Sequence, residues 1–419
     1  MSVTQKIIEE TRPRFVLTGT YCSANKGDAA MQTVMARQLA MAVPDADIVI
    51  SSPFPDRDAP FYAPMRVIKS GRRNLPMAMA HLVLLAIRNV LGRGSRRYPL
   101  DEEIDHISRA DVVVDLSGDM LTEDYGPLVG WSHFLPLLYA IATGREIAVC
   151  AQSIGPFNHL APIARFALSR SNVTVRERLS MRVFEDIGLS MDSAQVTADL
   201  AFLLETATPS RVDEILAAEG IVLTTRCLGV SVSALLTNRR NRHLKNVDGE
   251  LLAIFANAID AAARRHGLEV LIISHVFGPR EAADDRKVAE QLAKILSVRS
   301  HVLRNEYRPE ELKGVIGRCA AFVGCRMHAN IAALDSEVPV LAVGYSHKTA
   351  GIMDAAGQGH HVVSVEALNS ERLTERIGQL VLNEEQIRLS LRRALPNLRS
   401  LAKTNITRVL ELADGRNSP

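Results

Sequence analysis

Short apolar runs recur along the whole chain, and each is followed by glycine or polar residues and then by a longer stretch with helical spacing. In the first half these runs occupy residues 15–17, 48–52, 111–116, 146–151 and 173–175. In the second half they occupy residues 228–232, 269–274, 320–323 and 339–343. Runs of this length between helical stretches are typical of buried parallel strands. The pattern therefore predicts an α/β fold.

The alternation of strands and helices is interrupted once, near the middle of the chain. Residues 206–227 contain Pro209 and a short polar helical stretch, but no strand pattern. We therefore expect an N-terminal α/β domain over residues 1–205, a linker over 206–227 and a C-terminal α/β domain over 228–419. Two such halves resemble the two Rossmann-like domains of the GT-B-like glycosyltransferase architecture, and we expect the site in the cleft between them. Helices are predicted over residues 29–43, 75–91, 131–142, 249–266, 282–296 and 371–395, and the proline-rich residues 53–64 are predicted to be irregular.

Composition narrows the class of protein. The chain has 49 Lys and Arg against 47 Asp and Glu, and the net charge of +2 gives no support to nucleic-acid binding. The 5 cysteines form no C-x-x-C pair, which argues against a zinc site or a disulfide framework and for a reducing compartment. The N-terminal residues do not resemble a signal peptide, and no uncharged apolar run reaches ~18 residues, so no transmembrane helix is predicted. We expect a cytoplasmic protein.

Cationic and titratable residues follow the last two apolar runs of the second half. Arg326 and His328 come after one run, and Tyr345 and Lys348 come after the next. In open α/β sheets, ligands bind at the carboxyl ends of the strands. Arginine and lysine bind anions, and histidine exchanges protons near neutral pH. The pattern suits a small, doubly anionic ligand.

Each of these residues also has an ordinary structural interpretation. Arg326 could pair with Glu337 or Asp335. His328 could be a buried structural histidine, and Lys348 could be a surface residue in a polar turn. The residue types alone leave these alternatives open.

The first strand is followed by a turn, Asn25-Lys26-Gly27-Asp28, that opens a helix. A helix N-terminus offers free backbone N–H groups and a partial positive charge, so strand, turn and helix together make a site for an anion or a sugar. An ordinary strand-to-helix turn, with Asp28 near the helix start, is equally compatible with these residues.

Two further strand ends carry polar residues. Ser153 and Gly155 follow the run at 146–151, where they could contact a ligand or form an ordinary turn. Arg176 follows the run at 173–175 and could bind a ligand or pair at the surface with Glu177 or Glu185.

The motif R-M-H at residues 326–328, followed about twenty residues later by Y-x-x-K at 345–348, resembles the polysaccharide pyruvyltransferase family. The N-x-G-D turn at 25–28, the Q-S-I-G-P stretch at 152–156 and the R-E pair at 176–177 add to the resemblance. One stretch departs from it, because Gly118-Asp119 stands where members commonly have Gly-Gly. The resemblance implies transfer of a carboxyvinyl unit from phosphoenolpyruvate to a sugar, usually as a cyclic ketal, with no metal and no cofactor beyond this co-substrate.

The resemblance also implies roles for individual residues. His328 is implied as the general acid, and Asp28 is placed near the acceptor as a candidate base. Donor-binding residues are Arg176, Arg326, Tyr345 and Lys348. Acceptor or loop contacts are Asn25, Gly27, Ser153 and Gly155.

Residues 66–97 combine an apolar helix with basic flanks: Arg66, Lys69, Arg72, Arg73, Arg93, Arg96 and Arg97. His81 and Arg88 interrupt the apolar run, so it is not expected to cross a bilayer. The segment could lie on an anionic membrane surface, which would bring the protein to a lipid-linked acceptor at the inner membrane face. The alternative is a buried helix whose ends happen to be basic.

Two other functions fit the same architecture. A sugar-nucleotide glycosyltransferase would use the basic side chains on a diphosphate and release a nucleoside diphosphate. An inactive glycan-binding homologue would bind the acceptor without turnover.

Overall fold

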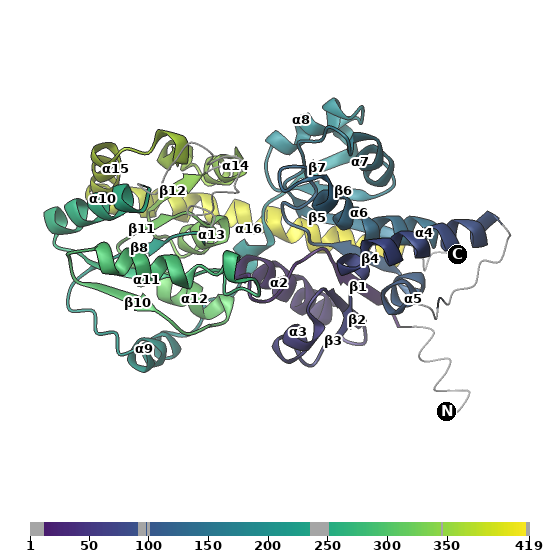
Figure 1. Ribbon diagram of the computed structural model, residues 1–419, viewed down its shortest axis with the longest axis horizontal. Helices are drawn as coiled ribbons and strands as arrows, with labels where there is room; N and C mark the ends of the chain where they lie inside the picture. The colour runs from purple at the N-terminus through teal and green to yellow at the C-terminus, as the bar shows by residue number, and fades with distance from the viewer. Residues whose placement is uncertain (1–11, 91–97, 99–100, 235–250, 345–346, 416–419) are drawn as a thin grey trace. The chain divides into compact units, whose positions relative to one another are not determined.

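The computed structural model describes residues 12–90, 98, 101–234, 251–344 and 347–415 (Figure 1). The chain divides into two compact units. Unit 1 comprises Met1–Ser23, Met31–Leu200 and Ser400–Pro419, and unit 2 comprises Ala24–Ala30 and Ala201–Arg399. The chain therefore passes between the units more than once, and not only near the predicted linker at residues 206–227. A short early segment belongs to unit 2, and the last residues belong to unit 1.

Unit 1 is built on a parallel sheet of 7 strands in the order β3-β2-β1-β4-β5-β6-β7. The strands are β1 (Arg14–Thr18), β2 (Asp47–Ser52), β3 (Arg66–Lys69), β4 (Val112–Asp115), β5 (Glu146–Gln152), β6 (Asn172–Val175) and β7 (Ala194–Val196). The helices that begin after β1 are α2 (Lys26–Ala42), α3 (Pro55–Tyr62), α4 (Leu75–Val90), α5 (Glu102–Arg109), α6 (Pro127–Ala142), α7 (Ala161–Leu168) and α8 (Leu179–Asp186). Short 3-10 turns are η1 (Gly71–Arg73), η2 (Met191–Ser193) and η3 (Leu200–Leu203).

Unit 2 repeats the design with a parallel sheet of 6 strands in the order β10-β9-β8-β11-β12-β13. The strands are β8 (Cys227–Ser231), β9 (Glu269–Ile273), β10 (Ser300–Leu303), β11 (Ala321–Gly324), β12 (Val340–Gly344) and β13 (Val362–Ser364). The helices are α9 (Pro209–Ala218), α10 (Leu251–His266), α11 (Arg286–Ile295), α12 (Pro309–Ile316), α13 (Met327–Asp335), α14 (His347–Ala355), α15 (Ser370–Leu382) and α16 (Glu384–Asp414), the last of which continues into unit 1. The 3-10 turns are η6 (Glu281–Ala283), η7 (Gly359–His361) and η8 (Val365–Ala367).

Both sheets have the strand order of a doubly wound Rossmann fold, with the first strand of each unit in the interior. The central strands β1, β4, β8 and β11 are almost completely buried, because helices cover both faces of a parallel sheet. The chain order reverses between β1 and β4 in unit 1, and between β8 and β11 in unit 2. Ligands of such sheets bind at this switch point, beside the carboxyl ends of the strands. The predicted α/β fold is confirmed.

The predictions failed mainly at the edges of the sheets. The strands β3, β10 and β13 were not predicted, because each is only 3 or 4 residues long and partly exposed. The prediction that residues 53–64 are irregular was wrong, since α3 lies there. Pro55 is the first residue of this helix. A proline is tolerated there because the backbone N–H groups of the first turn have no partner within the helix.

The segment over residues 66–97 contains the predicted helix as α4, but one of its basic residues was misjudged. Arg72 is 7% exposed, and its guanidinium donates to the carbonyl oxygens of Gly19 (2.8 Å) and Thr20 (2.6 Å). It fixes the loop after β1 and is not available to a membrane. Arg93, Arg96 and Arg97 lie outside the described residues. In the part of the chain that the structure describes, no helix has the length and apolar character to cross a bilayer.

Candidate functional site

The R-M-H motif stands at the switch point of unit 2. Strand β11 ends at Gly324, and His328 lies, half-buried, in the first turn of α13. The guanidinium of Arg326 donates two hydrogen bonds to the carboxylate of Asp285, at 3.0 Å and 2.6 Å. The partner of Arg326 is thus Asp285 rather than Glu337 or Asp335. Asp285 is completely buried, and this bidentate pair fixes the chain just before His328.

The N-x-G-D turn also belongs to unit 2, although it lies near the start of the chain. Asn25 forms an isolated β-bridge with Val276, and the backbone N–H of Lys26 donates to the carbonyl oxygen of His275 at 3.1 Å. Within the turn, the Asn25 side chain accepts from the backbone N–H of Gly27 at 3.1 Å, as asparagine does at a helix start. The turn is therefore anchored to the loop that follows β9.

Gly27 and His328 are in direct contact. A Cβ atom added to Gly27 would lie 2.5 Å from Cγ of the His328 ring and closer still to Nδ1. Real side-chain atoms do not approach so closely, so the ring occupies the space that any residue other than glycine would fill. The structure thus brings together the two motifs that the sequence analysis had singled out, separated by about three hundred positions in the chain.

Two buried lysines surround this contact. Lys26 is 1% exposed, and its Nζ lies 2.6 Å from a carboxylate oxygen of Glu306. Lys313 forms a buried ion pair with Asp335. A small cavity is lined by Lys26, Ala30, Ala201, Leu204, His275, Pro309, Lys313, His328 and Ala332. The lining of this space therefore contains two lysines and two histidines.

His275 follows β9 and lines the same cavity. Burial lowers the pKa of His275 well below its ordinary value, and the nearby charges of His328, Arg326 and Lys26 lower it further. The imidazole is consequently neutral at physiological pH. Within the described residues, its buried Nδ1 atom has no hydrogen-bond partner. A neutral imidazole in this position can accept or donate one hydrogen bond to a ligand.

Lys348, Tyr345 and Asp28 complete the predicted set in this unit. Lys348 is 7% exposed, so it is not a surface lysine. It lies in the first turn of α14, where the helix dipole does not favour a cation. Tyr345 lies outside the described residues. Asp28 is half-buried in the first turn of α2, where the helix dipole favours a carboxylate.

In unit 1, Arg176 is buried at the carboxyl end of β6. Its Nη1 lies 2.7 Å from Asp199, and its Nε donates to the hydroxyl of Ser153 at 2.8 Å. Both charged side chains of the ion pair are fully buried, so the surface pairing with Glu177 or Glu185 was wrong. Within the described residues, Nη2 of Arg176 has no hydrogen-bond partner, so its two N–H groups are not used by the protein.

We expect Arg176→Ala to destabilise the protein by about 3–5 kcal/mol, because it removes the cation that faces a buried carboxylate. Arg176→Ala combined with Asp199→Asn should recover part of this loss. Thermal or denaturant unfolding measures both, with Arg170→Ala as the control, since Arg170 is exposed. An unchanged unfolding free energy in Arg176→Ala would show that the pair contributes nothing to stability.

Ser153 and Gly155 form hydrogen bonds to another loop of unit 1 through their backbone N–H groups. The backbone N–H of Ser153 donates to the carbonyl of Gly118 at 2.8 Å, and the N–H of Gly155 donates to the carbonyl of Leu121, also at 2.8 Å. The loop containing Gly118 and Asp119 is thereby attached to the end of β5. Gly118 has a φ of +70°, a conformation that suits glycine, and a Cβ there would lie 3.8 Å from Nη1 of Arg176.

A buried polar cluster occupies the switch point of unit 1. The Asp115 carboxylate accepts from the backbone N–H of Ser117 at 3.1 Å, from its hydroxyl at 3.0 Å, and from Gln152 at 3.1 Å. Burial raises the pKa of Asp115 to about 6, although these hydrogen bonds and the charge of Arg72 act in the opposite direction. His133 lies 3.1 Å from Arg72, and its pKa is lowered well below the ordinary value by burial and by that charge.

The titration of Asp115 predicts a specific pH dependence of stability. The folded protein holds this proton more tightly than the unfolded chain, so the contribution of Asp115 to stability should decrease as the pH rises from about 4 to about 6. Asp115→Asn removes the titration. We therefore expect the unfolding free energy of the variant, relative to the wild type, to rise by up to about 3 kcal/mol over that interval. Urea unfolding at several pH values checks this, and a difference that stays constant with pH would contradict it.

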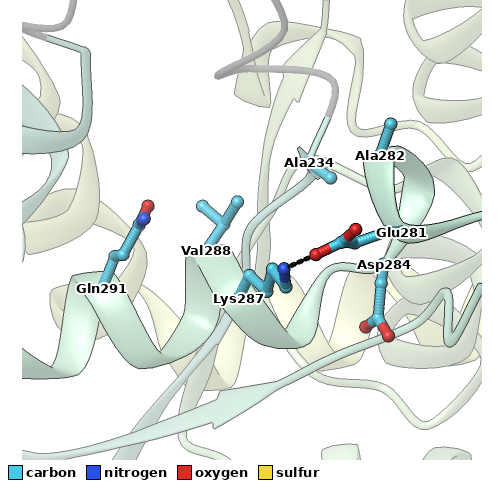
Figure 2. A pocket seen from close by; sticks show the side chains of 7 residues that line it. All are labelled: Ala234, Glu281, Ala282, Asp284, Lys287, Val288 and Gln291. Atoms are coloured by element: carbon cyan, nitrogen blue, oxygen red, sulfur yellow. Dashed lines mark hydrogen bonds and ion pairs between the residues drawn. The ribbon is translucent and has the colours of Figure 1, made fainter.

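A separate groove in unit 2 has a volume of about 400 Å³ and lies beside α11 (Figure 2). Its lining residues are Ala234, Glu281, Ala282, Asp284, Lys287, Val288 and Gln291. Lys287 points to Glu281 and is paired with it, so the described residues that line the groove include no unpaired cation. It shares no residue with the cavity beside His328, and its acidic lining does not suit an anionic donor.

Sequence reasoning missed several residues that shape these sites. Asp285 and Asp199 were overlooked because nothing local marks them as partners of distant arginines. Lys26 stands at the variable position of the N-x-G-D turn, and His275 directly follows a predicted strand. The position at a strand end was the signal that could have identified His275.

Comparisons with known proteins agree with the motifs. A family model described as polysaccharide pyruvyl transferase matches residues 25–347, which begin at Asn25 of the turn and cover more than three-quarters of the chain. The amylovoran biosynthesis protein AmsJ of Erwinia amylovora is 25% identical over 428 aligned positions, covering 95% of this chain and 99% of that protein.

Solved structures of similar fold are much more distant in sequence. A putative UDP-N-acetylglucosamine 2-epimerase from Listeria monocytogenes superposes with a TM-score of 0.61 at 11% identity, covering 97% of this chain and 96% of that one. A glycosyltransferase from Rickettsia africae gives a TM-score of 0.52 at 10% identity, covering 96% and 99%. These likenesses confirm the GT-B-like fold with two Rossmann-like domains.

Proposed function

Because the chain belongs to the polysaccharide pyruvyl transferase family, we propose that it moves the carboxyvinyl unit of phosphoenolpyruvate onto two hydroxyls of a sugar as a pyruvate ketal. The observation that carries this proposal is the contact between Gly27 and His328 beside two buried lysines. It places an imidazole, a group that can exchange protons, beside Lys26 and Lys313, whose charges are paired with Glu306 and Asp335.

The reaction needs protons to move in a defined way. One sugar oxygen bonds to C2 of phosphoenolpyruvate while the methylene carbon gains a proton and becomes a methyl group. The C2–O bond to phosphate then breaks, and the second sugar oxygen bonds to C2. The two hydroxyls lose two protons, of which one ends on the methyl group and one on the released phosphate. The scheme requires a proton donor near C3 and cations for the phosphate and the carboxylate.

The residues of this chain can fill these roles. In the proposal, His328 delivers the proton to the methylene carbon, since an imidazole ring can donate and accept protons. Lys348, Tyr345 and Arg326 bind the donor, with Arg326 oriented by Asp285.

Other predicted residues keep narrower roles in the proposal. Arg176 is a further donor contact through its remaining Nη2 donor. Asp28 is the candidate base for a sugar hydroxyl. Asn25 and Gly27 shape the turn beside His328, and Ser153 and Gly155 support the loop contacts of unit 1.

The acceptor is proposed to be a polysaccharide or its lipid-linked precursor, handled in the cytoplasm at the inner membrane face. The name of the Erwinia amylovora relative, which refers to amylovoran biosynthesis, supports an exopolysaccharide. The family match supports phosphoenolpyruvate as the proposed donor and a ketal as the proposed product.

The test is phosphate release from phosphoenolpyruvate by the purified protein with a panel of lipid-linked and soluble glycans. Mass spectrometry of the product should show the added pyruvate with loss of water. Release of a nucleoside diphosphate from a sugar nucleotide instead would identify a glycosyltransferase. Acceptor binding without any product would identify an inactive glycan-binding homologue.

A further inference from the structure

Helix α4 packs only one of its faces on unit 1. Ala78, His81 and Leu85 are buried, and their spacing of three and four residues places them on one side. All exposed positions from residue 76 to residue 87 are apolar: Pro76, Met77, Ala80, Val83, Leu84, Ala86 and Ile87, here named the α4 apolar face. Met77, Val83 and Ile87 are 53%, 54% and 49% exposed. A helix that is apolar all round is normally covered on every side, and a contiguous exposed apolar patch marks an interaction surface.

The segment of sequence that contains this helix carries charge of one sign, although Asp101, just after the segment, lies 3.3 Å from His81 of α4. Residues 59–100 contain no Asp or Glu, although acidic residues make up 47 of the 419 in the chain. Arg66 and Lys69 are exposed on β3, which leads into α4 through η1. The buried Arg72 does not contribute to this surface. The apolar face is therefore accompanied by exposed positive charge that no acidic residue in its own segment of sequence offsets.

We propose that the α4 apolar face docks on an anionic lipid bilayer, with its side chains in the outer acyl region and with Arg66 and Lys69 at the lipid headgroups. An interfacial helix binds by this combination of apolar burial and attraction to anionic headgroups. A second copy of the chain fits less well, because a two-fold contact would bring the same cationic segment to both sides. A saccharide fits less well too, because the face has neither aromatic rings nor hydrogen-bonding groups. The proposal stands independently of the donor chemistry proposed above.

The test is flotation of the full chain with vesicles of phosphatidylcholine alone and of phosphatidylcholine mixed equally with phosphatidylglycerol. We expect binding to the mixed vesicles at low salt, and weaker binding as salt rises. The triple variant Met77→Gln, Val83→Gln, Ile87→Gln should lose binding at every salt concentration. Arg66→Gln with Lys69→Gln should weaken binding at low salt by about fivefold for each charge removed. Met41→Gln is the control, because Met41 is 70% exposed and lies on another helix of unit 1.

The control for folding is the unfolding temperature of each variant. The altered side chains are exposed, so unfolding temperatures should match the wild type and a lost interaction would not reflect lost folding. Three results would overturn the proposal: wild-type protein that ignores the mixed vesicles at low salt, a triple variant that binds as the wild type does, or a dimer without vesicles that the triple variant converts to a monomer. The last result would assign the α4 apolar face to a second copy of the chain.

Discussion

His328→Ala should lower kcat with phosphoenolpyruvate by about 100-fold or more, the usual scale for removal of a general acid. His328 follows β11 at the switch point of unit 2, and its ring packs on Gly27 instead of being fully enclosed in the core. The variant should therefore fold normally. Steady-state kinetics and thermal unfolding, measured on the same preparation, test both statements.

A matched control is available in the same unit. His360 is exposed and distant in sequence, so His360→Ala should leave kcat unchanged. Retention of wild-type kcat in His328→Ala would remove this residue from the mechanism. A fall in kcat accompanied by a large fall in unfolding temperature would instead identify a structural histidine.

Gly27→Ala should reduce kcat/KM by about 10- to 100-fold, although the substitution is outside the R-M-H motif. The added Cβ overlaps the His328 ring, which must move, and a displacement of about 1 Å at a reacting group can cost 100-fold. In an ordinary helix the same change would be stabilising by up to ~1 kcal/mol, because alanine is the better helix former. Loss of activity with little change in stability is therefore the expected result.

A double mutant separates this mechanism from a general effect on folding. If Gly27→Ala acts through His328, adding it to His328→Ala should cause no further loss, since residues that act as a unit are not additive. Gly415→Ala is the control, because a Cβ there would keep 3.4 Å from its nearest neighbour. Independent, additive losses would show that Gly27 does not act through the histidine.

The α/β class and the central strands could be predicted because their apolar runs are uninterrupted by charged residues over most of their length and their neighbours in sequence form helices. The contact of Gly27 with His328 could not be derived, because periodicity describes local structure and carries no information on which distant loops meet. The same limit explains Asp285 and Asp199, whose partners lie elsewhere in the chain. Arg72 was misjudged for a related reason. An arginine beside an apolar helix is usually solvated, and here the buried carbonyl groups of Gly19 and Thr20 accept its hydrogen bonds instead.

The division of the chain between the units has a consequence for how the protein is made. Lys26 leaves the ribosome early, but its partner Glu306 is 280 positions away. The turn around Gly27 therefore cannot form its contacts until most of the chain has been synthesised. Contacts of such separation form late and slow folding, because a long loop must close before they give any stabilisation. A fragment ending near residue 205 would carry the turn without its support, and a fragment beginning there would lack the turn that touches His328. We therefore expect that neither half, synthesised alone, assembles the contact between Gly27 and His328, and that a growing chain forms this contact only after most of it has been made.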